Sequence, residues 1–341
     1  MKTIRLGTRA SALALWQASW TRDALVALGY DVEIVKITTT GDVNRNEAIV
    51  NLGAQGVFTK EIQKALVLGE IDVAAHSLKD LPVEPVPGLT LAAVPERADP
   101  RDVFLSNKCA TLDELPPGAV VGSSSMRRKS MILRYGAKRR PDAAPWRVRD
   151  VRGNVETRLA KLDAGEYDAL VLADAGLTRL GFDARRRAYL ERPDFLPAVG
   201  QGALGLETRE DDAETRAAVE KLLHRPTYLS VLAERAFMAK LQGGCVMPIG
   251  ALGTFANVDG AEILALDAQV LSFDGAKSYA TQSIQMLKPG ADAPEIPLET
   301  QSALAELLGR GAAETLLEQG ADVVVEEARQ FRARRDDDPK Q

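Results

Sequence analysis

Polar and apolar positions follow a strand, turn and helix order from the start of the chain. Residues 3–6 alternate like a short strand, residues 7–11 form a polar turn, and residues 12–28 carry apolar side chains at helical spacing. Ser11 precedes that helix and can accept a hydrogen bond from its first turn. A second strand is predicted at residues 31–37. The pattern is typical of an α/β fold.

The same order returns later in the chain. Residues 119–121 predict a strand, residues 122–125 a turn and residues 126–135 a helix, while residues 165–171 match residues 69–75 in composition and place. Two uses of one strand–turn–helix unit indicate two similar α/β lobes. Ligands in such folds bind at the carboxyl ends of strands, often between lobes.

A third unit begins near residue 226. It has a helix over residues 230–240, a pair of strands at 262–273 and 277–284 joined through Asp274 and Gly275, and a helix over 300–319. We therefore divide the chain into three domains and a tail. Lobe 1 takes residues 1–98 and 201–224, lobe 2 takes 99–200, the C-terminal domain takes 225–332, and residues 333–341 form a charged, disordered tail.

Residues 43–56 show little periodicity and contain two glycines. We expect a mobile loop there that covers a cleft, with Phe58 and Lys60 at its edge, and a helix over residues 58–68. A strand follows at residues 72–75. Its end presents the run His76-Ser77-Leu78-Lys79-Asp80.

Composition narrows the possible functions. The only cysteines are Cys109 and Cys245, which provide no disulfide framework, so a reducing cytoplasmic setting is expected. With two histidines and no Cys/His cluster, no metal site is predicted. The chain has no long apolar run, so no membrane span is predicted. It starts directly with a strand-like pattern, without an apparent leader.

Charge is unevenly distributed. Residues 127–192 hold 17 Lys and Arg against nine Asp and Glu, a net of +8, whereas the remainder carries −13. Fourteen of those 17 cations are arginine, whose planar fork suits carboxylate or phosphate. A run of charges is usually a solvated face. Here the cations lie beside Ser and Gly turns, which favours an anion site.

Single features in the chain remain ambiguous. Cys245 lies in a Gly243-Gly244-Cys245 loop after a helix, where it is either a small buried residue or a nucleophile and covalent anchor. Asp80 alone is more typical of a turn, the three serines at 123–125 of a helix cap, and His76 of a packed strand end. Their combination carries more information than any one of them.

Together these runs resemble the porphobilinogen deaminase family, over about residues 3–330. The matching stretches, in the family's order, are Thr8-Arg9-Ala10-Ser11 with Leu15-Trp16-Gln17, Thr40-Gly41-Asp42, Phe58-Thr59-Lys60-Glu61, His76-Ser77-Leu78-Lys79-Asp80-Leu81-Pro82, Val121-Gly122-Ser123-Ser124-Ser125-Met126-Arg127-Arg128, Arg152-Gly153-Asn154 with Thr157-Arg158-Leu159, Ala198-Val199-Gly200-Gln201-Gly202-Ala203, and Gly243-Gly244-Cys245.

The resemblance implies two doubly wound lobes, like a type II periplasmic binding protein, with a cleft between them and a small α+β C-terminal domain. It implies a transferase of haem (tetrapyrrole) synthesis that joins four porphobilinogen molecules head to tail, releases ammonia at each step, and frees hydroxymethylbilane by hydrolysis. A dipyrromethane cofactor, held by a thioether to Cys245, would prime the chain. The family also implies a cytoplasmic monomer with no nucleic-acid or membrane partner.

The resemblance also assigns roles. Asp80 would stabilise the cationic methylene-pyrrole left after ammonia departs and would move protons. Each porphobilinogen carries an acetate and a propionate, so many cations and hydroxyls are expected around the growing chain. The implied cofactor and substrate binders are Arg9, Ser11, Gln17, Lys79, Ser123, Ser124, Ser125, Arg127, Arg128, Arg152, Arg158, Arg179 and Gln201.

Some positions depart from the family pattern. Ser123 replaces an expected Thr, Gln242 an expected Glu, and Asp174 a neutral residue, which adds an acid near Arg179. Residues 139–148 look like a surface insertion.

Three other classes are compatible with parts of the chain. A solute-binding module would need neither the cysteine loop nor a third domain. An acyl-transfer enzyme with a cysteine nucleophile would need a histidine base in a matching motif. A nucleic-acid binder would need more than 5% aromatic residues and a less acidic remainder.

Overall fold

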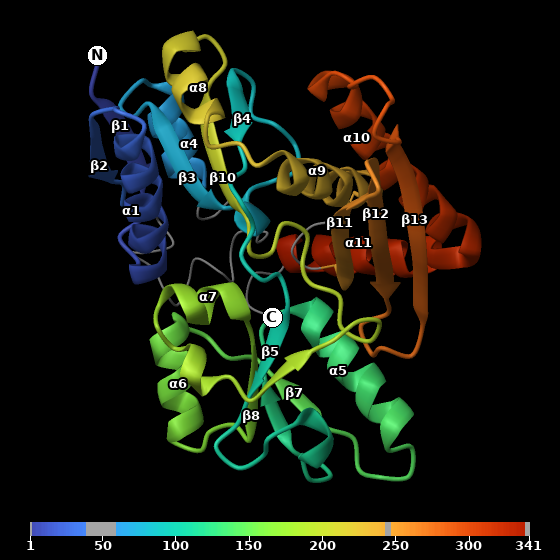
Figure 1. Cartoon of the computed structure of the whole chain (residues 1–341). Helices are drawn as coiled ribbons and strands as arrows, with labels where there is room; N and C mark the ends of the chain where they lie inside the picture. The colour runs from blue at the N-terminus through green and yellow to red at the C-terminus, as the bar shows by residue number, and fades with distance from the viewer. Residues whose placement is uncertain (1, 39–58, 243–246, 338–341) are drawn as a thin grey trace.

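Lobe 1 is built on a five-stranded sheet of order β2-β1-β3-β10-β4 (Figure 1). The computed structural model describes residues 2–38, 59–242 and 247–337, with side chains up to residue 331. β1 is parallel to β2 and β3, while β10 is antiparallel to β3 and β4. The elements of lobe 1 are β1 (Ile4–Thr8), α1 (Ala12–Ala27), β2 (Val32–Lys36), α4 (Lys60–Val67), β3 (Val73–Ser77), β4 (Leu89–Ala93), β10 (Leu204–Arg209) and α8 (Ala213–Glu220).

Lobe 2 repeats this arrangement in the order β7-β6-β8-β5-β9. β6 is parallel to β7 and β8, and β5 is antiparallel to β8 and β9. The antiparallel strand inside each sheet is the one that the chain enters after crossing from the other lobe. The elements of lobe 2 are β5 (Asp102–Leu105), β6 (Val120–Gly122), α5 (Met126–Arg139), β7 (Arg147–Arg149), α6 (Val155–Asp163), β8 (Ala169–Ala173), α7 (Asp174–Arg179) and β9 (Ala188–Leu190).

A pair of glycines shows how closely the lobes correspond. A Cβ on Gly7 of β1 would lie 2.3 Å from Ile71, and one on Gly122 of β6 would lie 2.5 Å from Leu170 and 2.9 Å from Tyr167. Ile71 and Tyr167 occupy matching places, each just before a central parallel strand. Both lobes therefore need a residue without a side chain at this point.

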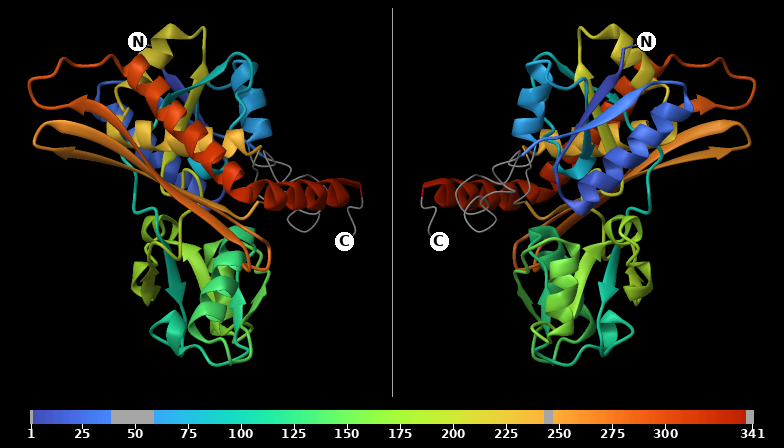
Figure 2. Two further views of the ribbon diagram at one scale, coloured as in Figure 1. Left: turned by 90° about the vertical axis from the view of Figure 1, so that its right-hand side faces the viewer. Right: turned by 90° about the vertical axis from the view of Figure 1, so that its left-hand side faces the viewer.

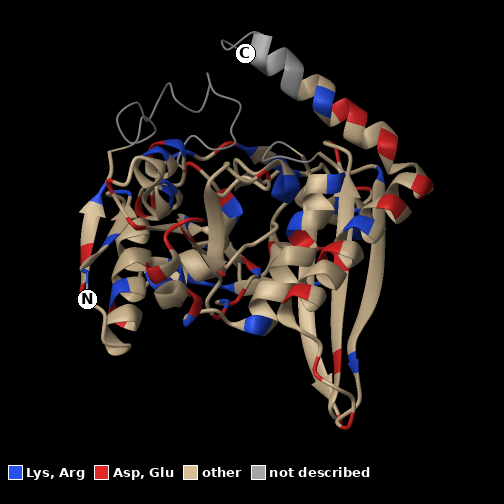
Figure 3. Ribbon diagram, turned by 90° about the horizontal axis from the view of Figure 1, so that it is seen from above, with Lys and Arg blue, Asp and Glu red and all other residues tan. Residues whose placement is uncertain are grey.

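The C-terminal domain packs two helices against an antiparallel sheet of order β11-β12-β13. Its elements are α9 (Arg225–Lys240), β11 (Ile249–Val258), β12 (Ala261–Leu271), β13 (Ser278–Pro289), α10 (Leu298–Leu316) and α11 (Asp322–Asp337). Phe237 of α9 and Ala313 of α10 are fully buried in its core. The first half of α11 packs into the same core through Val324, Val325 and Ala328, and the helix then projects from the body of the molecule (Figure 2). Acidic and basic side chains lie along its described part (Figure 3).

Glu234 of α9 joins this domain to both crossings between the lobes. Its carboxylate lies 2.5 Å from the guanidinium of Arg97 on one crossing and accepts from the N–H of Gly200 on the other (2.7 Å). It also accepts from the N–H of Gly253 in β11 (2.9 Å). Glu234 is fully buried, so each of these bonds lies in a dry environment. The C-terminal domain is therefore fixed directly to both crossings between the lobes.

The predicted architecture of two similar lobes and a separate C-terminal domain is confirmed, and so are α1 and the β12–β13 pair. One local prediction is wrong, because α11 runs through residues 333–337, which were assigned to a disordered tail. Within residues 139–148, Trp146 is 4% exposed and packs in the core of lobe 2, whereas most of this stretch is exposed, and its assignment as an insertion stays a prediction. The proposed domain boundaries stay a prediction.

Lys60, assigned to the loop edge, is the first residue of α4 and so belongs to a helix. Residues 39–58, including Phe58 and the predicted loop, lie outside the described residues. Residues 243–246 with Cys245, and residues 338–341, also lie outside them. None of the described helices combines the length and apolar content needed to cross a bilayer.

Candidate active site

Asp80 ends a short 3-10 turn, Leu78–Asp80, directly after β3. Leu78 is 1% exposed, and its N–H donates to the carbonyl oxygen of Ala203 (3.0 Å), so it anchors the turn. Asp80 itself is exposed. A buried strand followed by one anchoring leucine thus places a carboxylate at the carboxyl end of β3, where open α/β sheets bind ligands.

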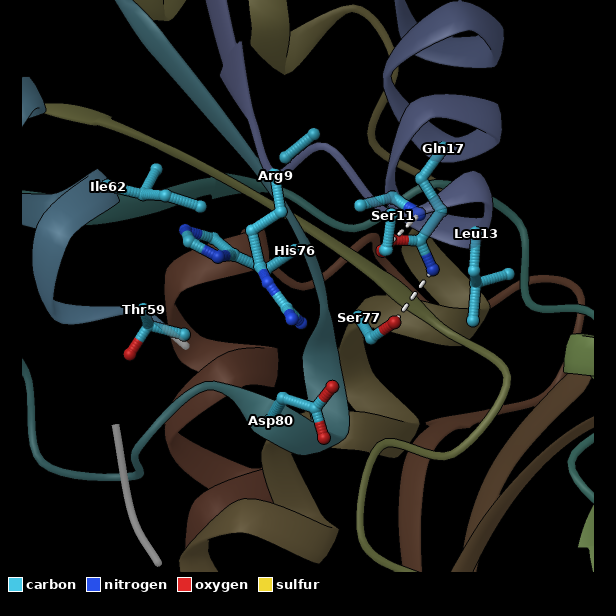
Figure 4. Close-up of a pocket in the computed structure, with 11 residues that line it drawn as sticks. Arg9, Ser11, Leu13, Gln17, Thr59, Ile62, His76, Ser77 and Asp80 are labelled. Carbon is cyan, nitrogen blue, oxygen red and sulfur yellow. Dashed lines mark hydrogen bonds between the residues drawn. The ribbon is translucent and has the colours of Figure 1, made fainter. Parts of the chain in front are cut away.

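A pocket opens at this end of lobe 1 (Figure 4). Asp80 is the only carboxylate among the described residues that line it. The polar lining comes from the end of β1, the first half of α1, the residue before α4, and the end of β3 with the turn that follows it. The fold thus brings together four residues predicted from the sequence, which are Arg9, Ser11, Gln17 and Asp80. The polar lining residues are Arg9, Ser11, Gln17, Thr59, His76, Ser77 and Asp80.

Gln17 and Ser11 fix the α1 side of the pocket. Gln17 is 2% exposed, and its Nε2 donates to the Oγ of Ser77 (2.7 Å), which ties α1 to the end of β3. Ser11 caps α1 by accepting from the N–H of Ala14 (3.3 Å). Ser77 was not among the predicted site residues, although it lies in the same motif as Asp80.

His76 and Glu207 form a buried pair behind the pocket. The Nε2 of His76 lies 2.9 Å from a carboxylate oxygen of Glu207, at an angle outside hydrogen-bond geometry. Glu207 of β10 also accepts from the Nε2 of Gln63 in α4 (3.1 Å). No local pattern marked Glu207, because it meets His76 only through the antiparallel pairing of β10 with β3.

Lys79 lies in the Leu78–Asp80 turn, next to Asp80. Burial lowers the pKa of its ammonium to about 8; Asp80 opposes the shift, and the positive charge of Arg128 adds to it. Asp102 also opposes the shift and Arg127 adds to it, both at smaller magnitude. Charges from both lobes therefore act on the Lys79 ammonium.

Asp102, at the start of β5, organises three residues that were predicted as binders. It lies 2.7 Å from the Nη1 of Arg127, 2.8 Å from the Nη2 of Arg128, and accepts from the Nε2 of Gln201 (2.7 Å). Burial alone would raise the pKa of Asp102, but the two arginines hold it well below its usual range. The sequence did not indicate this acid.

Arg127 and Gln201 point into the protein. The Nη1 of Arg127 also donates to the carbonyl oxygen of Leu196 (2.6 Å), and the Nε2 of Gln201 donates to that of Pro100 (2.7 Å). Both side chains are at most 4% exposed. These contacts favour a structural role for both, and their role as binders stays a prediction.

The three serines form the turn between β6 and α5. Ser125 caps α5 by accepting from the N–H of Arg128, and the Oγ of Ser123 accepts from the N–H of Ser125 (3.3 Å). The Oγ of Ser124 donates to the carbonyl oxygen of Val151 (2.8 Å). The turn therefore lies at the N-terminus of a 14-residue helix, which favours anions.

The remaining predicted arginines belong to lobe 2. Burial and the nearby charge of Arg128 lower the pKa of Arg158, and burial lowers the pKa of Arg179 to about 10. Arg179 donates to the carbonyl oxygen of Gly202 (2.7 Å) and covers the ring of Trp16 in lobe 1 (5.4 Å to the centroid). Arg152 is exposed.

Asp174 does not pair with Arg179. Its carboxylate lies 2.5 Å from the Nη2 of Arg186 and accepts from the hydroxyl of Thr178. The charge of Asp174 is therefore neutralised by Arg186 within lobe 2. Because Asp174 forms its ion pair with Arg186, it leaves Arg179 available to another anion.

Two family models match the chain. One, described as porphobilinogen deaminase, dipyromethane cofactor binding domain, matches residues 4–217. The other, described as porphobilinogen deaminase, C-terminal domain, matches residues 228–318.

Solved structures to which the chain is similar include the methionine-binding protein MetQ, at 16% identity over 70% of this chain and 94% of that one, with a TM-score of 0.41. A second is described as a putative methionine-binding lipoprotein from Bacillus subtilis, at 16% identity over 65% and 90%, with a TM-score of 0.40. A third is the periplasmic VFT2 domain of Bordetella pertussis BvgS, at 16% identity over 64% and 86%, with a TM-score of 0.37.

Proposed function

The chain belongs to the porphobilinogen deaminase family, transferases that make hydroxymethylbilane on a dipyrromethane cofactor, and we propose that Asp80 carries the chemistry and Cys245 the cofactor. The observation that carries this proposal is the pocket at the end of β3. It sets a single described carboxylate, Asp80, beside the guanidinium of Arg9 and the polar groups of Ser11 and Gln17.

The described residues fit a cofactor rich in carboxylates. Arg158 and Arg179 are desolvated, their pKa values are lowered by burial, and neither has a carboxylate within ion-pair distance among the described residues. The Nε of Arg179 is buried without a hydrogen-bond acceptor. Cations in this state are stabilised by an anionic ligand. We propose that they hold carboxylates of the cofactor, together with Lys79 and the N-terminal turn of α5.

Substrate binding falls to lobe 1 in this proposal. Arg9, Ser11 and Gln17 would hold the acetate and propionate of porphobilinogen at the start of α1, where helix amides also favour anions. The carboxylate of Asp80 would accept a hydrogen bond from the pyrrole N–H of the substrate. When ammonia leaves, the aminomethyl carbon becomes positively charged, and a carboxylate held in place stabilises that charge.

Bond formation then requires a proton to leave a pyrrole carbon. Asp80, the carboxylate among the described residues that line the pocket, would take this proton in the manner of general base catalysis. When bound, the dipyrromethane supplies the pyrrole carbon at which the first substrate unit is added. The binder set that we propose, beyond residues already placed in lobe 1, is Lys79, Ser123, Ser124, Ser125, Arg127, Arg128, Arg152, Arg158, Arg179 and Gln201.

We also propose attachment of the cofactor through Cys245 and a cytoplasmic monomer. Intact mass spectrometry of the purified protein tests the attachment. The expected mass exceeds the sequence mass by two pyrrole units, and Cys245→Ala shows the unmodified mass and no product formation. Cys109→Ala is the matched control and should keep both the added mass and the activity. Active wild-type enzyme with an unmodified mass would contradict the proposal.

A further inference from the structure

Arg235 reaches from the C-terminal domain to the main chain that follows Asp80. Its Nη1 donates to the carbonyl oxygen of Leu81 (3.1 Å), and its Nη2 donates to that of Pro82 (2.6 Å). These are the first two carbonyls after the proposed catalytic residue. One planar guanidinium thus holds two successive peptide units from a different domain.

The guanidinium of Arg235 is placed at a cost. Burial lowers its pKa, with only partial compensation from the charge of Glu207, and it has no carboxylate within ion-pair distance among the described residues. Arg235 is half-buried, and a cation that is partly withdrawn from water requires strong hydrogen bonds, which the two carbonyl oxygens supply here.

The other side of the turn is held by the second crossing between the lobes. A Cβ on Gly200 would lie 3.2 Å from Leu78 and 3.3 Å from the amide nitrogen of Lys79, so the crossing packs directly on the turn. Gly200 in turn donates its N–H to Glu234, the residue before Arg235. Two consecutive residues of α9 therefore act on the catalytic turn, Glu234 through the crossing and Arg235 through Leu81 and Pro82.

We propose that Arg235 is a positioning residue for Asp80. By holding the carbonyls of Leu81 and Pro82, it fixes the end of the turn and with it the direction of the Asp80 carboxylate. α9, which carries Arg235, is also the helix that precedes Cys245 in the sequence. This inference rests on the proposed role of Asp80, and it assigns Arg235 an effect through Asp80, not through contact with substrate or cofactor.

Steady-state kinetics on the cofactor-loaded enzyme test the proposal. Arg235→Gln removes the charge and the two-pronged donor, and Arg235→Lys keeps the charge but not the fork. We expect kcat to fall about 10- to 100-fold in Arg235→Gln, the scale that a 1 Å misplacement produces, with KM for porphobilinogen within about twofold of wild type. The kcat of Arg235→Lys should lie between the values of Arg235→Gln and the wild type. Arg216→Gln, at an exposed ion pair on α8, is the matched control and should match wild type.

Chemical rescue separates positioning from general destabilisation. Added methylguanidinium should restore the kcat of Arg235→Ala, and this effect should reach saturation. The same compound should leave the kcat of the wild type unchanged. Intact mass confirms that each variant keeps its cofactor. A kcat within threefold of wild type in Arg235→Gln, or a rise in KM alone, would overturn the positioning role. Absence of both cofactor mass and product formation in the wild type would instead overturn the proposed function, and the positioning role with it.

Discussion

The carboxylate of Asp102 lies 2.7 Å from the Nη1 of Arg127, and both side chains are almost fully buried, at 1% and 4% exposure. Arg127 follows a hydroxyl-rich turn in an arginine-rich segment, so its sequence context indicates an anion-binding residue. The fold turns the guanidinium inward, onto an acid at the start of β5. The acid that Arg127 binds is therefore a residue of the protein itself, Asp102.

Arg127→Leu should therefore lower stability. It leaves Asp102 with one arginine and one amide in a dry interior, and breaking a buried pair in this way costs roughly 3–5 kcal/mol. The midpoint of chemical denaturation should fall clearly, while the exposed Arg152→Leu, as a control, should unfold like wild type. If Arg127→Leu unfolds normally but fails to bind the cofactor, the inward contacts are not what fixes this residue.

Lys79 should set an alkaline limit on ligand binding. Its folded pKa is lowered to about 8 from an ordinary value of 10.5, so its ammonium loses charge as the pH rises above 8. A bound carboxylate favours the charged form, which shifts the limit upward between these two values. KM for porphobilinogen should rise through this range in the wild type. Arg stays charged there, so Lys79→Arg should flatten the profile.

Lys79 has the opposite effect on folding. Between pH 8 and 10.5 the unfolded chain binds more protons at this position than the folded chain, so the free energy of unfolding contributed by Lys79 increases with pH. Below pH 8 the buried charge is a constant cost. Denaturation of the cofactor-free protein at pH 7.5 and 9.5, against Lys79→Met, measures the difference, and equal pH dependence in both proteins would contradict it.

Glu234→Gln should weaken the attachment of the C-terminal domain to the two crossings between the lobes and lower the stability of the protein. The amide keeps one acceptor oxygen but loses the charge that pairs with Arg97, and an N–H of Gly200 or Gly253 then faces a donor. An unsatisfied buried donor costs about 1–3 kcal/mol, and losing the charge adds to this. The thermal midpoint should fall by several degrees. Glu220→Gln, at an exposed pair on α8, should leave it unchanged.

How far the sequence predicts this molecule depends on the range of each interaction. α1, its Ser11 cap and the placement of Asp80 follow from local order, because a strand end, a turn and a helix start are encoded by adjacent residues. Glu207, Asp102 and Glu234 could not be found in this way. Each meets its partners across strands or domains, and its sequence neighbours are ordinary. The inward direction of Arg127 has the same origin.

Asp80 gives the most informative substitutions in the proposed mechanism. Asp80→Asn keeps the shape of the side chain but loses its negative charge and its ability to take a proton. If Asp80 stabilises the positive charge and moves the proton, kcat should fall by about 100-fold or more. Folding should be retained, because Asp80 is exposed at the end of the Leu78–Asp80 turn, and Leu78 supplies the anchor.

Asp80→Glu separates chemistry from a role in the turn. Glu keeps the carboxylate but displaces it by one methylene, so activity should rank wild type above Glu above Asn. A turn-forming aspartate would give the reverse order for the two variants, because Asn makes the same local backbone hydrogen bonds as Asp and Glu does not. Product formation by the three cofactor-loaded proteins, with circular dichroism to confirm folding, decides between the roles. Since Asp80 is the only carboxylate among the described pocket residues, near-normal turnover in the Asn variant would move the proton transfer to His76 or Lys79.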